Sequence, residues 1–276
     1  MNTNMIKIIN IDNTAYNSLN NHNSLIADNT VNTWQRDRTP EEKKADTDIG
    51  KKAEFAVESY IKINLNNIEY IGYDNFRTNN YKKHAPFDGL LFNKKIDKDI
   101  IENLKKKIND EITKNKYGQI SDSIKQELYN NKIYTVEIKS TKIGDRHLSN
   151  SKIDLSKILK DDFLTYPKFL RSHKSIGSID EYIKYCIYNK YLQCDENEDC
   201  FEKIKTIEFQ NMQHIYIRVY MDIENNNAYI VGFIESEQFI SKLAIKKMKH
   251  LNKSEHALYF YYPLKDGKDI DLLNNK

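Results

Sequence analysis

Two short apolar segments of this sequence carry charged residues that could act together. Asp88 adjoins one apolar run, and Glu137 and Lys139 flank Ile138 in another. Side chains alternate between the two faces of an extended strand, so Glu137 and Lys139 point the same way. A carboxylate and an ammonium group are costly to bury on a core strand. A second carboxylate from another strand therefore favours a metal site.

Each of these residues also has a plainer interpretation. Asp88 could belong to a turn or a β-bulge beside Gly89. Glu137 and Lys139 could form a solvated strand face on which their charges compensate each other. The metal-site hypothesis therefore depends on the elements that would bring the two segments together.

The composition is typical of a globular chain. Its 276 residues are enough for one large domain, with 39% hydrophobic and 30% charged residues. A formal net charge of +3 neither requires nor excludes a nucleic-acid partner, because a basic cleft can coexist with acidic surface elsewhere.

No apolar run is long enough for a transmembrane helix, and the N-terminus lacks the apolar core of a signal peptide. We expect a cytoplasmic protein without a membrane partner.

The cysteines favour neither a disulfide framework nor a metal knuckle. Cys186, Cys194 and Cys200 are few and odd in number, which argues against paired disulfides. His173 and His214 lie on either side of them and could complete a zinc site. The spacing contains no Cys-x-x-Cys pair, so we expect ordinary free thiols and no structural zinc.

The order of the predicted elements indicates the fold class. Residues 1–38 are rich in Asn and Ser and should form an irregular arm, with a short strand at 6–11. Thr39, followed by Pro40 and Glu42, predicts a capped helix that runs to about residue 63. The later elements are strands at 68–76 and 86–92, a helical insertion at about 96–130, a central strand at 133–141, a helical region at about 151–210, strands at 214–223 and 228–234, a helix at 235–249 and a strand at 257–263. This order predicts an α/β fold with a mixed central β-sheet flanked by helices, in one domain at 39–276.

Three segments in this order resemble a known nuclease superfamily. They are Gly50-Lys-Lys-Ala-Glu54 on the first helix, Pro86-Phe-Asp88-Gly89, and Val136-Glu137-Ile-Lys139-Ser140 on the central strand. Together they look like the PD-(D/E)xK superfamily, whose fold is shared by type II restriction endonucleases and many repair and recombination nucleases. The resemblance covers about residues 40–141 by motif, and residues 215–234 by the order of elements. It implies a restriction-endonuclease-like core with helical insertions.

The resemblance also implies a Mg²⁺-dependent reaction, in which Mn²⁺ can replace Mg²⁺. Asp88, Glu137 and the main-chain carbonyl of Ile138 would bind the metal ion, which prefers oxygen ligands. Lys139 would orient the attacking water and offset the negative charge that develops during hydrolysis of a phosphodiester.

A glutamate from the preceding helix often assists the metal-bound waters in this superfamily, and Glu54 matches it by position. Glu58, one turn later, is the alternative, and an exposed helix glutamate is the plainer interpretation of both. Asp74 also follows an apolar run and competes with Asp88, although it lacks the Pro-Phe-Asp-Gly context.

Basic residues beside these motifs are candidates for contacts with DNA phosphates. They are Lys51, Lys52, Lys82, Lys83, His84, Lys142, Arg146 and His147. Solvated surface charge explains each of them equally well. The segment 161–171, expected to be helical, is a candidate for base recognition or for dimer formation.

The favoured function is a sequence-specific type II restriction enzyme that cleaves double-stranded DNA as a homodimer. A nonspecific or structure-directed nuclease of DNA repair, recombination or phage DNA processing is the first alternative. A non-catalytic DNA-binding protein of the same fold is the second. Because a site without chemistry has no need for Asp88, Glu137 and Lys139, these residues argue against the last alternative.

Overall fold

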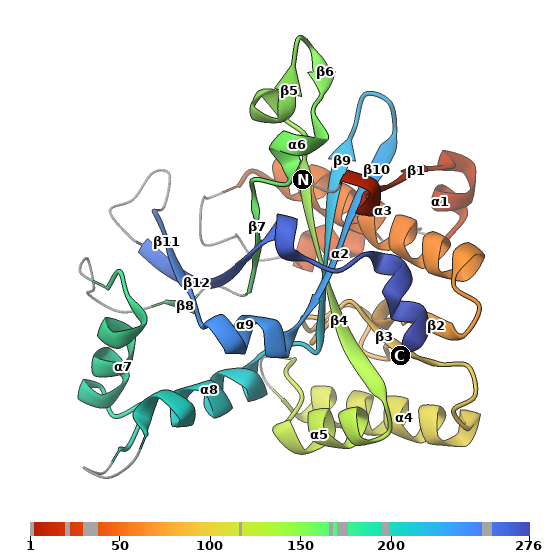
Figure 1. Cartoon of the computed structure of the whole chain (residues 1–276). Helices are drawn as coiled ribbons and strands as arrows, with labels where there is room; N and C mark the ends of the chain where they lie inside the picture. The colour runs from red at the N-terminus through yellow and green to blue at the C-terminus, as the bar shows by residue number, and fades with distance from the viewer. Residues whose placement is uncertain are drawn as a thin grey trace.

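The computed structural model describes residues 3–19, 23–29, 38–115, 118–165, 168–169, 176–194, 199–249 and 256–276. Its main sheet has six strands in the spatial order β1 (Lys7–Asn10), β10 (Asn227–Glu235), β9 (Ile215–Asp222), β4 (Ile133–Lys142), β3 (Gly89–Asn93) and β2 (Ile68–Gly72). Neighbouring strands run antiparallel, except that β4 and β9 are parallel. Figure 1 shows helices on both sides of this sheet, which confirms the predicted α/β class. Within the described ranges, no helix has the length and apolar character needed to cross a membrane.

One face of the sheet is covered by α3 (Pro40–Asn64). The predicted capping box is confirmed: the Glu42 N–H donates to the Thr39 hydroxyl at 3.2 Å, and the Thr39 N–H donates to the Glu42 carboxylate at 2.9 Å. Small and apolar residues of α3, such as Ala53 and Val57, then pack onto alternate residues of the strands. This packing directs Val136 of β4 toward α3, and it turns the intervening side chains of β4 to the opposite face.

The opposite face carries helices from two parts of the chain. The predicted helical insertion is confirmed as α4 (Lys98–Lys114) and α5 (Asp122–Asn130), which pack on Leu90 and Phe92 of β3. The other helices on this face are α7 (Ile179–Tyr188), α8 (Cys200–Asn211) and α9 (Ser236–Lys242). They share a core with Tyr216 and Tyr220 of β9.

A smaller sheet replaces parts of two predicted helices. It contains β11 (Ile245–Lys249), β12 (His256–Pro263), β7 (Asp162–Leu164) and β8 (Lys168–Phe169). The helix predicted at 235–249 therefore ends early, because Leu243 adopts a left-handed backbone conformation and the following residues pair with β12. The prediction of helix at 161–171 was also wrong in its described part, since β7 and β8 both pair with β12.

The region before these strands is only partly helical. A hairpin of β5 (Leu148–Ser149) and β6 (Lys152–Ile153) follows β4, and the short helix α6 (Leu155–Ile158) comes next. Figure 1 shows the hairpin projecting at the top of the molecule, beyond the end of β4. The prediction of a helical region at about 151–210 therefore holds for α6, α7 and α8 but fails for the strands between them.

The N-terminal arm is more ordered than predicted. β1 confirms the short strand and pairs with β10 at the edge of the main sheet. Two helices follow, α1 (Asn13–Leu19) and α2 (Asn23–Asn29), so the expectation of an irregular arm was wrong for these residues. Tyr16 of α1 is buried and its hydroxyl donates to the Asp48 carboxylate at 2.8 Å. Contacts with α3 thus stabilise a segment whose polar composition predicted little structure.

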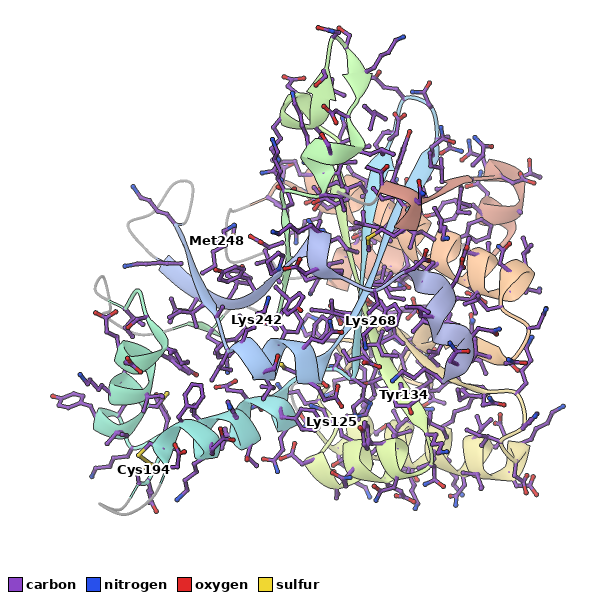
Figure 2. The ribbon with its side chains drawn as sticks, in the orientation of Figure 1. Lys125, Tyr134, Cys194, Lys242, Met248 and Lys268 are labelled. Carbon is purple, nitrogen blue, oxygen red and sulfur yellow. A yellow bond between two sulfur atoms is a disulfide. The ribbon has the colours of Figure 1, made fainter. Side chains whose placement is uncertain are left out.

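The expectation of free thiols was wrong for two of the cysteines. Cys194 and Cys200 form a disulfide between α7 and α8, with their Cα atoms 5.8 Å apart (Figure 2). Cys186 is free and buried. Two cysteines form a disulfide only where the fold brings their Cα atoms close enough, and a separation of six positions in the sequence does not decide this. His173 lies outside the described residues.

Candidate active site

Asp88 lies where β3 and β4 separate. β3 begins at Gly89, which faces Val136, whereas β4 continues to Lys142. The Asp88 N–H donates to the Val136 carbonyl at 2.9 Å, and the Asp88 carboxylate accepts from the Ile138 N–H at 2.6 Å. The predicted strand at 86–92 therefore starts after Asp88. Two hydrogen bonds hold the aspartate against the edge of β4 that extends past the start of β3.

The carbonyl of Ile138 lies on the same edge of β4. The N–H and C=O groups of one strand residue point to the same neighbouring strand. Since the Ile138 N–H points to Asp88, the Ile138 carbonyl also points to the side of β4 that Asp88 occupies, just before the start of β3. Asp88 and the Ile138 carbonyl thus offer oxygen ligands next to each other.

Glu137 and Lys139 occupy the face of β4 opposite α3. The Lys139 ammonium donates to the Glu137 carboxylate at 2.6 Å. Only 7% of the Glu137 side chain is exposed, against 27% for Lys139. The pair therefore matches the predicted orientation, and Lys139 balances a carboxylate that is almost fully removed from water.

A second charged group approaches Asp88 from α3. The Lys51 ammonium donates to both oxygens of Glu54, at 2.8 and 2.7 Å, and lies 2.7 Å from the Asp74 carboxylate. Arg77 contacts the other oxygen of Asp74 at 2.7 Å. The predicted strand at 68–76 ends at Gly72, and a 3-10 turn, Tyr73–Asn75, brings Asp74 to this position. Lys51, predicted as a DNA contact, thus positions Glu54 within the site.

The carboxylates of the site influence one another. Burial raises the pKa of Asp88 well above its usual value, and the charges of Glu137 and Glu54 raise it further against the opposing charge of Lys51. Burial also raises the pKa of Glu54, although Lys51 opposes this shift. The pKa of Asp74 is lowered, because Lys51 and Arg77 outweigh the effect of its burial. The folded protein therefore disfavours the charged forms of Asp88 and Glu54, mainly because both carboxyl groups are buried.

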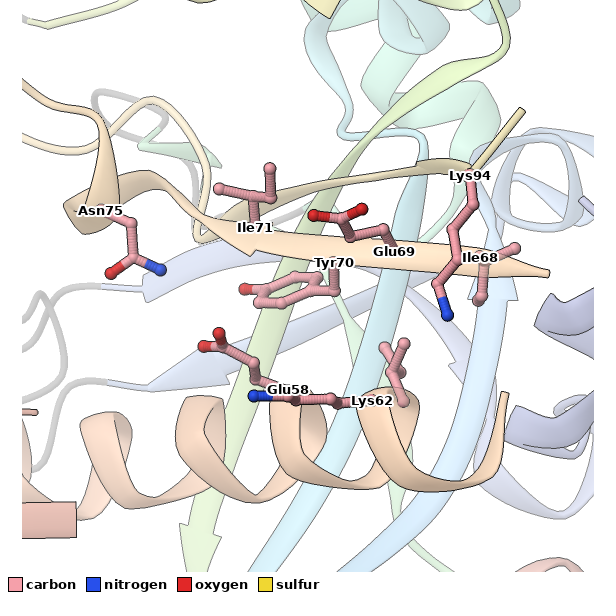
Figure 3. Close-up of a pocket in the computed structure, with 9 residues that line it drawn as sticks. Glu58, Lys62, Ile68, Glu69, Tyr70, Ile71, Asn75 and Lys94 are labelled. Carbon is pink, nitrogen blue, oxygen red and sulfur yellow. The ribbon is translucent and has the colours of Figure 1, made fainter. Parts of the chain in front are cut away.

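The two alternative candidates, Glu58 and Asp74, have partners other than Glu137 in the structure. Glu58 contributes to a cavity of about 360 Å³ between α3 and β2, together with Lys62, Glu69 and Lys94 (Figure 3). Asp74 is held by two cations and serves as their counter-ion. Among the candidate carboxylates, the pKa values of Glu54 and Asp88 are both raised by the charge of Glu137.

The oxygen ligands fit Mg²⁺ as part of a larger coordination shell. Within the described ranges, no three His, Cys, Asp or Glu side chains are grouped so that they could hold a metal ion. Mg²⁺ commonly uses one or two carboxylates and completes its octahedron with waters and substrate phosphate. Asp88, Glu137 and the Ile138 carbonyl fit this pattern. A divalent cation would also relieve the like-charge repulsion that raises the pKa of Asp88.

Two of the predicted DNA contacts are held within the protein. His147 is 2% exposed, and its Nε2 lies 3.1 Å from the Asp161 carboxylate. Lys52 is 3.1 Å from the Asp48 carboxylate and lies over the Tyr16 ring. In the structure these contacts engage the polar atoms of both residues, and their role as phosphate contacts stays a prediction.

The remaining basic candidates lie nearer to solvent. Lys142 is exposed at the end of β4, and Lys82 and His84 are exposed in the link before Asp88. Lys83 is half-buried, and its carbonyl accepts from Arg77 at 2.6 Å. The Arg146 side chain is 66% exposed and contacts Asp161 at 2.9 Å.

Tyr70 and Arg218 were missed from the sequence. The Tyr70 hydroxyl is buried and, among the described residues, has no hydrogen-bond partner. Burial raises its pKa well above the usual value, and the nearby charges of Glu54 and Asp88 raise it further. Arg218 lies in the middle of β9 beside Lys139. An arginine within an apolar strand was a visible signal of a special role, whereas Tyr70 resembled an ordinary core residue.

Gly89 is needed where it lies, next to Asp88. A Cβ at this position would be 2.4 Å from the Tyr70 ring and hydroxyl. We expect Gly89→Ala to destabilise the protein by about 1–3 kcal/mol, since the buried ring has little room to move. Thermal unfolding should show a melting temperature lower by several degrees, at roughly 2–4 °C per kcal/mol. Gly144→Ala is the control, because nothing lies within 4 Å of its added Cβ. Equal melting temperatures for both variants would contradict this role of Gly89.

Asp88, Glu137, Lys139 and Glu54 form the candidate site through the elements that hold them. No protein-family model, curated protein or solved structure matches this chain.

Proposed function

We propose that this protein is a Mg²⁺-dependent endonuclease that hydrolyses phosphodiester bonds of double-stranded DNA. One observation carries the proposal: the Asp88 carboxylate accepts a hydrogen bond from the Ile138 N–H at 2.6 Å. Ile138 lies between Glu137 and Lys139 on β4, and these two residues form an ion pair. Oxygen ligands and an ammonium group thus lie together beside β4, next to the start of β3. The half-buried Glu54 adds a carboxylate from α3. This arrangement suits the hydrolysis of an anionic substrate better than it suits stability, because the buried carboxylates repel each other.

Each residue has a distinct part in the proposed reaction. Bound Mg²⁺ supplies charge neutralisation at the phosphate and a water of lowered pKa. Asp88, Glu137 and the Ile138 carbonyl would hold this ion. Lys139 would orient the attacking water through its ammonium group and offset negative charge on the phosphate oxygens.

Glu54 would accept a hydrogen bond from a water at the metal ion. Lys51 contacts both of its oxygens, at 2.8 and 2.7 Å, and thereby fixes the orientation of the carboxylate. Positioning of this kind can account for a large share of a catalytic rate, because a small displacement of a reacting group is costly.

A sequence-specific type II restriction endonuclease, acting as a homodimer, is the favoured member of this class. Large parts of the chain lie outside the site, including α4, α5, α7, α8 and the smaller sheet. These elements offer surface for base recognition and for a second subunit, which a minimal nuclease would not need. A nonspecific or structure-directed nuclease is the alternative, and it would use the same catalytic residues.

Incubation with plasmid DNA tests the proposal. With Mg²⁺ or Mn²⁺ we expect cleavage, and with a chelator we expect none. Discrete fragments whose ends all map to the same DNA sequence would indicate a restriction enzyme. A smear of fragments would indicate a nonspecific or structure-directed nuclease. Intact plasmid in every metal, from protein that melts cooperatively, would overturn the proposed activity.

A further inference from the structure

Arg218 is a buried cation on the same sheet face as Glu137 and Lys139. β9 alternates like β4: Ile217 and Val219 pack toward α3, so Arg218 points to the opposite face. In the parallel register, Arg218 lies directly beside Lys139. Only 9% of Arg218 is exposed.

The contacts of Arg218 are with neutral groups. Its Nη2 donates to the Thr141 hydroxyl at 2.5 Å, and the guanidinium lies 5.0 Å from the centre of the Tyr220 ring. The Tyr220 hydroxyl is a further neighbour, and it donates to Asp161 at 2.6 Å. The Nε atom is buried without a hydrogen-bond partner in the part of the chain that the structure describes. No ion pair of Arg218 occurs among those residues.

Two adjacent cations on one sheet face are unfavourable without an anion. Like charges directly opposite each other on neighbouring strands destabilise a sheet. The Glu137 carboxylate neutralises the charge of Lys139 at 2.6 Å. Among the described residues, no carboxylate lies within ion-pair distance of Arg218, which is 9% exposed. A buried guanidinium without a counter-ion destabilises a fold, because burial removes its hydration and no opposite charge replaces it. Such a cost is explained if a ligand supplies the missing negative charge.

We propose that Arg218, held by Thr141, binds a phosphate of the DNA strand that is cleaved, next to the position where Lys139 meets the scissile group. This inference rests on the proposed nuclease function and names a further residue that contacts the substrate. Guanidinium groups suit the role, because their planar donors match phosphate oxygens. Thr141 orients the group before DNA arrives.

The test compares Arg218→Met and Arg218→Lys with the wild type on a short duplex that contains a cleavage site mapped in plasmid DNA. Arg218→Met should lower kcat/KM for cleavage by about 10²–10³-fold, the usual cost of losing one charge-stabilising donor. Arg218→Lys keeps the charge and should recover part of this loss. DNA binding measured by fluorescence anisotropy in Ca²⁺ should show a slope of log Kd against log salt that is smaller by about 0.9 for Arg218→Met.

Arg38→Met is the matched control. The Arg38 side chain is 5% exposed and lies 3.0 Å from Asp46. Arg38→Met therefore also removes a buried arginine, but one that lies just before the first turn of α3. This control should lower the melting temperature and leave the salt slope unchanged. Arg218→Met should change the salt slope and should not lower the melting temperature, because it removes an uncompensated buried charge.

The outcomes separate the two proposals. A wild-type salt slope and a wild-type kcat/KM in Arg218→Met, together with a lower melting temperature, would assign Arg218 a structural role and overturn the inference. If the wild type does not cut plasmid DNA with Mg²⁺ but binds a duplex of arbitrary sequence, the nuclease proposal fails, while the salt slopes on that duplex still decide whether Arg218 contacts phosphate. Absence of DNA binding by the wild type would overturn both.

Discussion

Asp88→Asn is expected to lower DNA cleavage on the order of 10³-fold and, at the same time, to raise the melting temperature of the metal-free protein. Asparagine keeps an oxygen that can accept from the Ile138 N–H, which lies 2.6 Å from the Asp88 carboxylate. It removes the negative charge that a metal ion would need. It also removes the repulsion from Glu137 and Glu54 that raises the pKa of Asp88.

The stability gain should depend on pH in a definite direction. The pKa of Asp88 is raised well above 3.8 in the folded protein, so the folded state binds the proton more tightly than the unfolded state does. Stability therefore falls as the pH rises from about 4 through the folded pKa. Asp88→Asn abolishes this loss. Its melting temperature should match the wild type near pH 4 and exceed it at neutral pH.

Thermal unfolding from pH 4 to pH 8 without metal, followed by cleavage assays with Mg²⁺, tests both parts of this prediction. Asp110→Asn is the control, because Asp110 is exposed on α4. It should change neither stability nor cleavage. If Asp88→Asn cut DNA at the wild-type rate, Asp88 would be a turn residue without a role in the reaction.

Lys139→Met is expected to lower the single-turnover rate of cleavage by about 10²–10³-fold, with smaller effects on DNA binding. The ammonium group would act on charge that develops during the reaction, so its loss should affect the rate more than the affinity. The stability should change in the opposite direction from Asp88→Asn. Lys139 contacts Glu137 at 2.6 Å, and its removal leaves a carboxylate that is only 7% exposed without this counter-ion.

Rapid mixing of preformed enzyme–DNA complexes with Mg²⁺ measures this rate directly. Lys107→Met is the control, because Lys107 forms a surface ion pair with Glu127 at 2.6 Å on the helical insertion. Its loss should cost less than about 1 kcal/mol of stability and leave the rate unchanged. A wild-type rate in Lys139→Met would remove the lysine from the reaction.

Elements with strong local signals were predicted well. The hairpin of β2 and β3, the central strand β4 and the pair β9 and β10 all appear where alternating or continuous apolar residues indicated strands. The start of α3 was predicted by the capping box of Thr39 and Glu42. These signals depend on neighbours within a few residues, so they can be read without the rest of the chain.

Elements that depend on distant partners were predicted poorly. Residues 245–249 form a strand because β12 lies beside them, although their many lysines are compatible with a helix. α1 is stabilised where Tyr16 meets Asp48 of α3. The disulfide between Cys194 and Cys200 depends on the approach of α7 and α8. Tertiary contacts outweigh local preference in each of these cases.

The sequence by itself determined the residue types and the strand context of the candidate site. Alternation along β4 was enough to place Glu137 and Lys139 on one face, because the geometry of a strand leaves no other arrangement. Only the tertiary structure decided which charges surround them. The start of β3 at Gly89 places Asp88 beside β4, and the fold of α3 brings the charges of Glu54 and its partner Lys51 close to Asp88.

The same distinction applies to Arg218, which is 218 − 139 = 79 positions from Lys139 in the chain and directly beside it in the sheet. Electrostatic interactions act through space, and their strength depends on burial and on the nearest counter-charge. A sequence lists the charges of a protein. The fold decides which of them are paired, which are excluded from water, and which are left to meet a ligand.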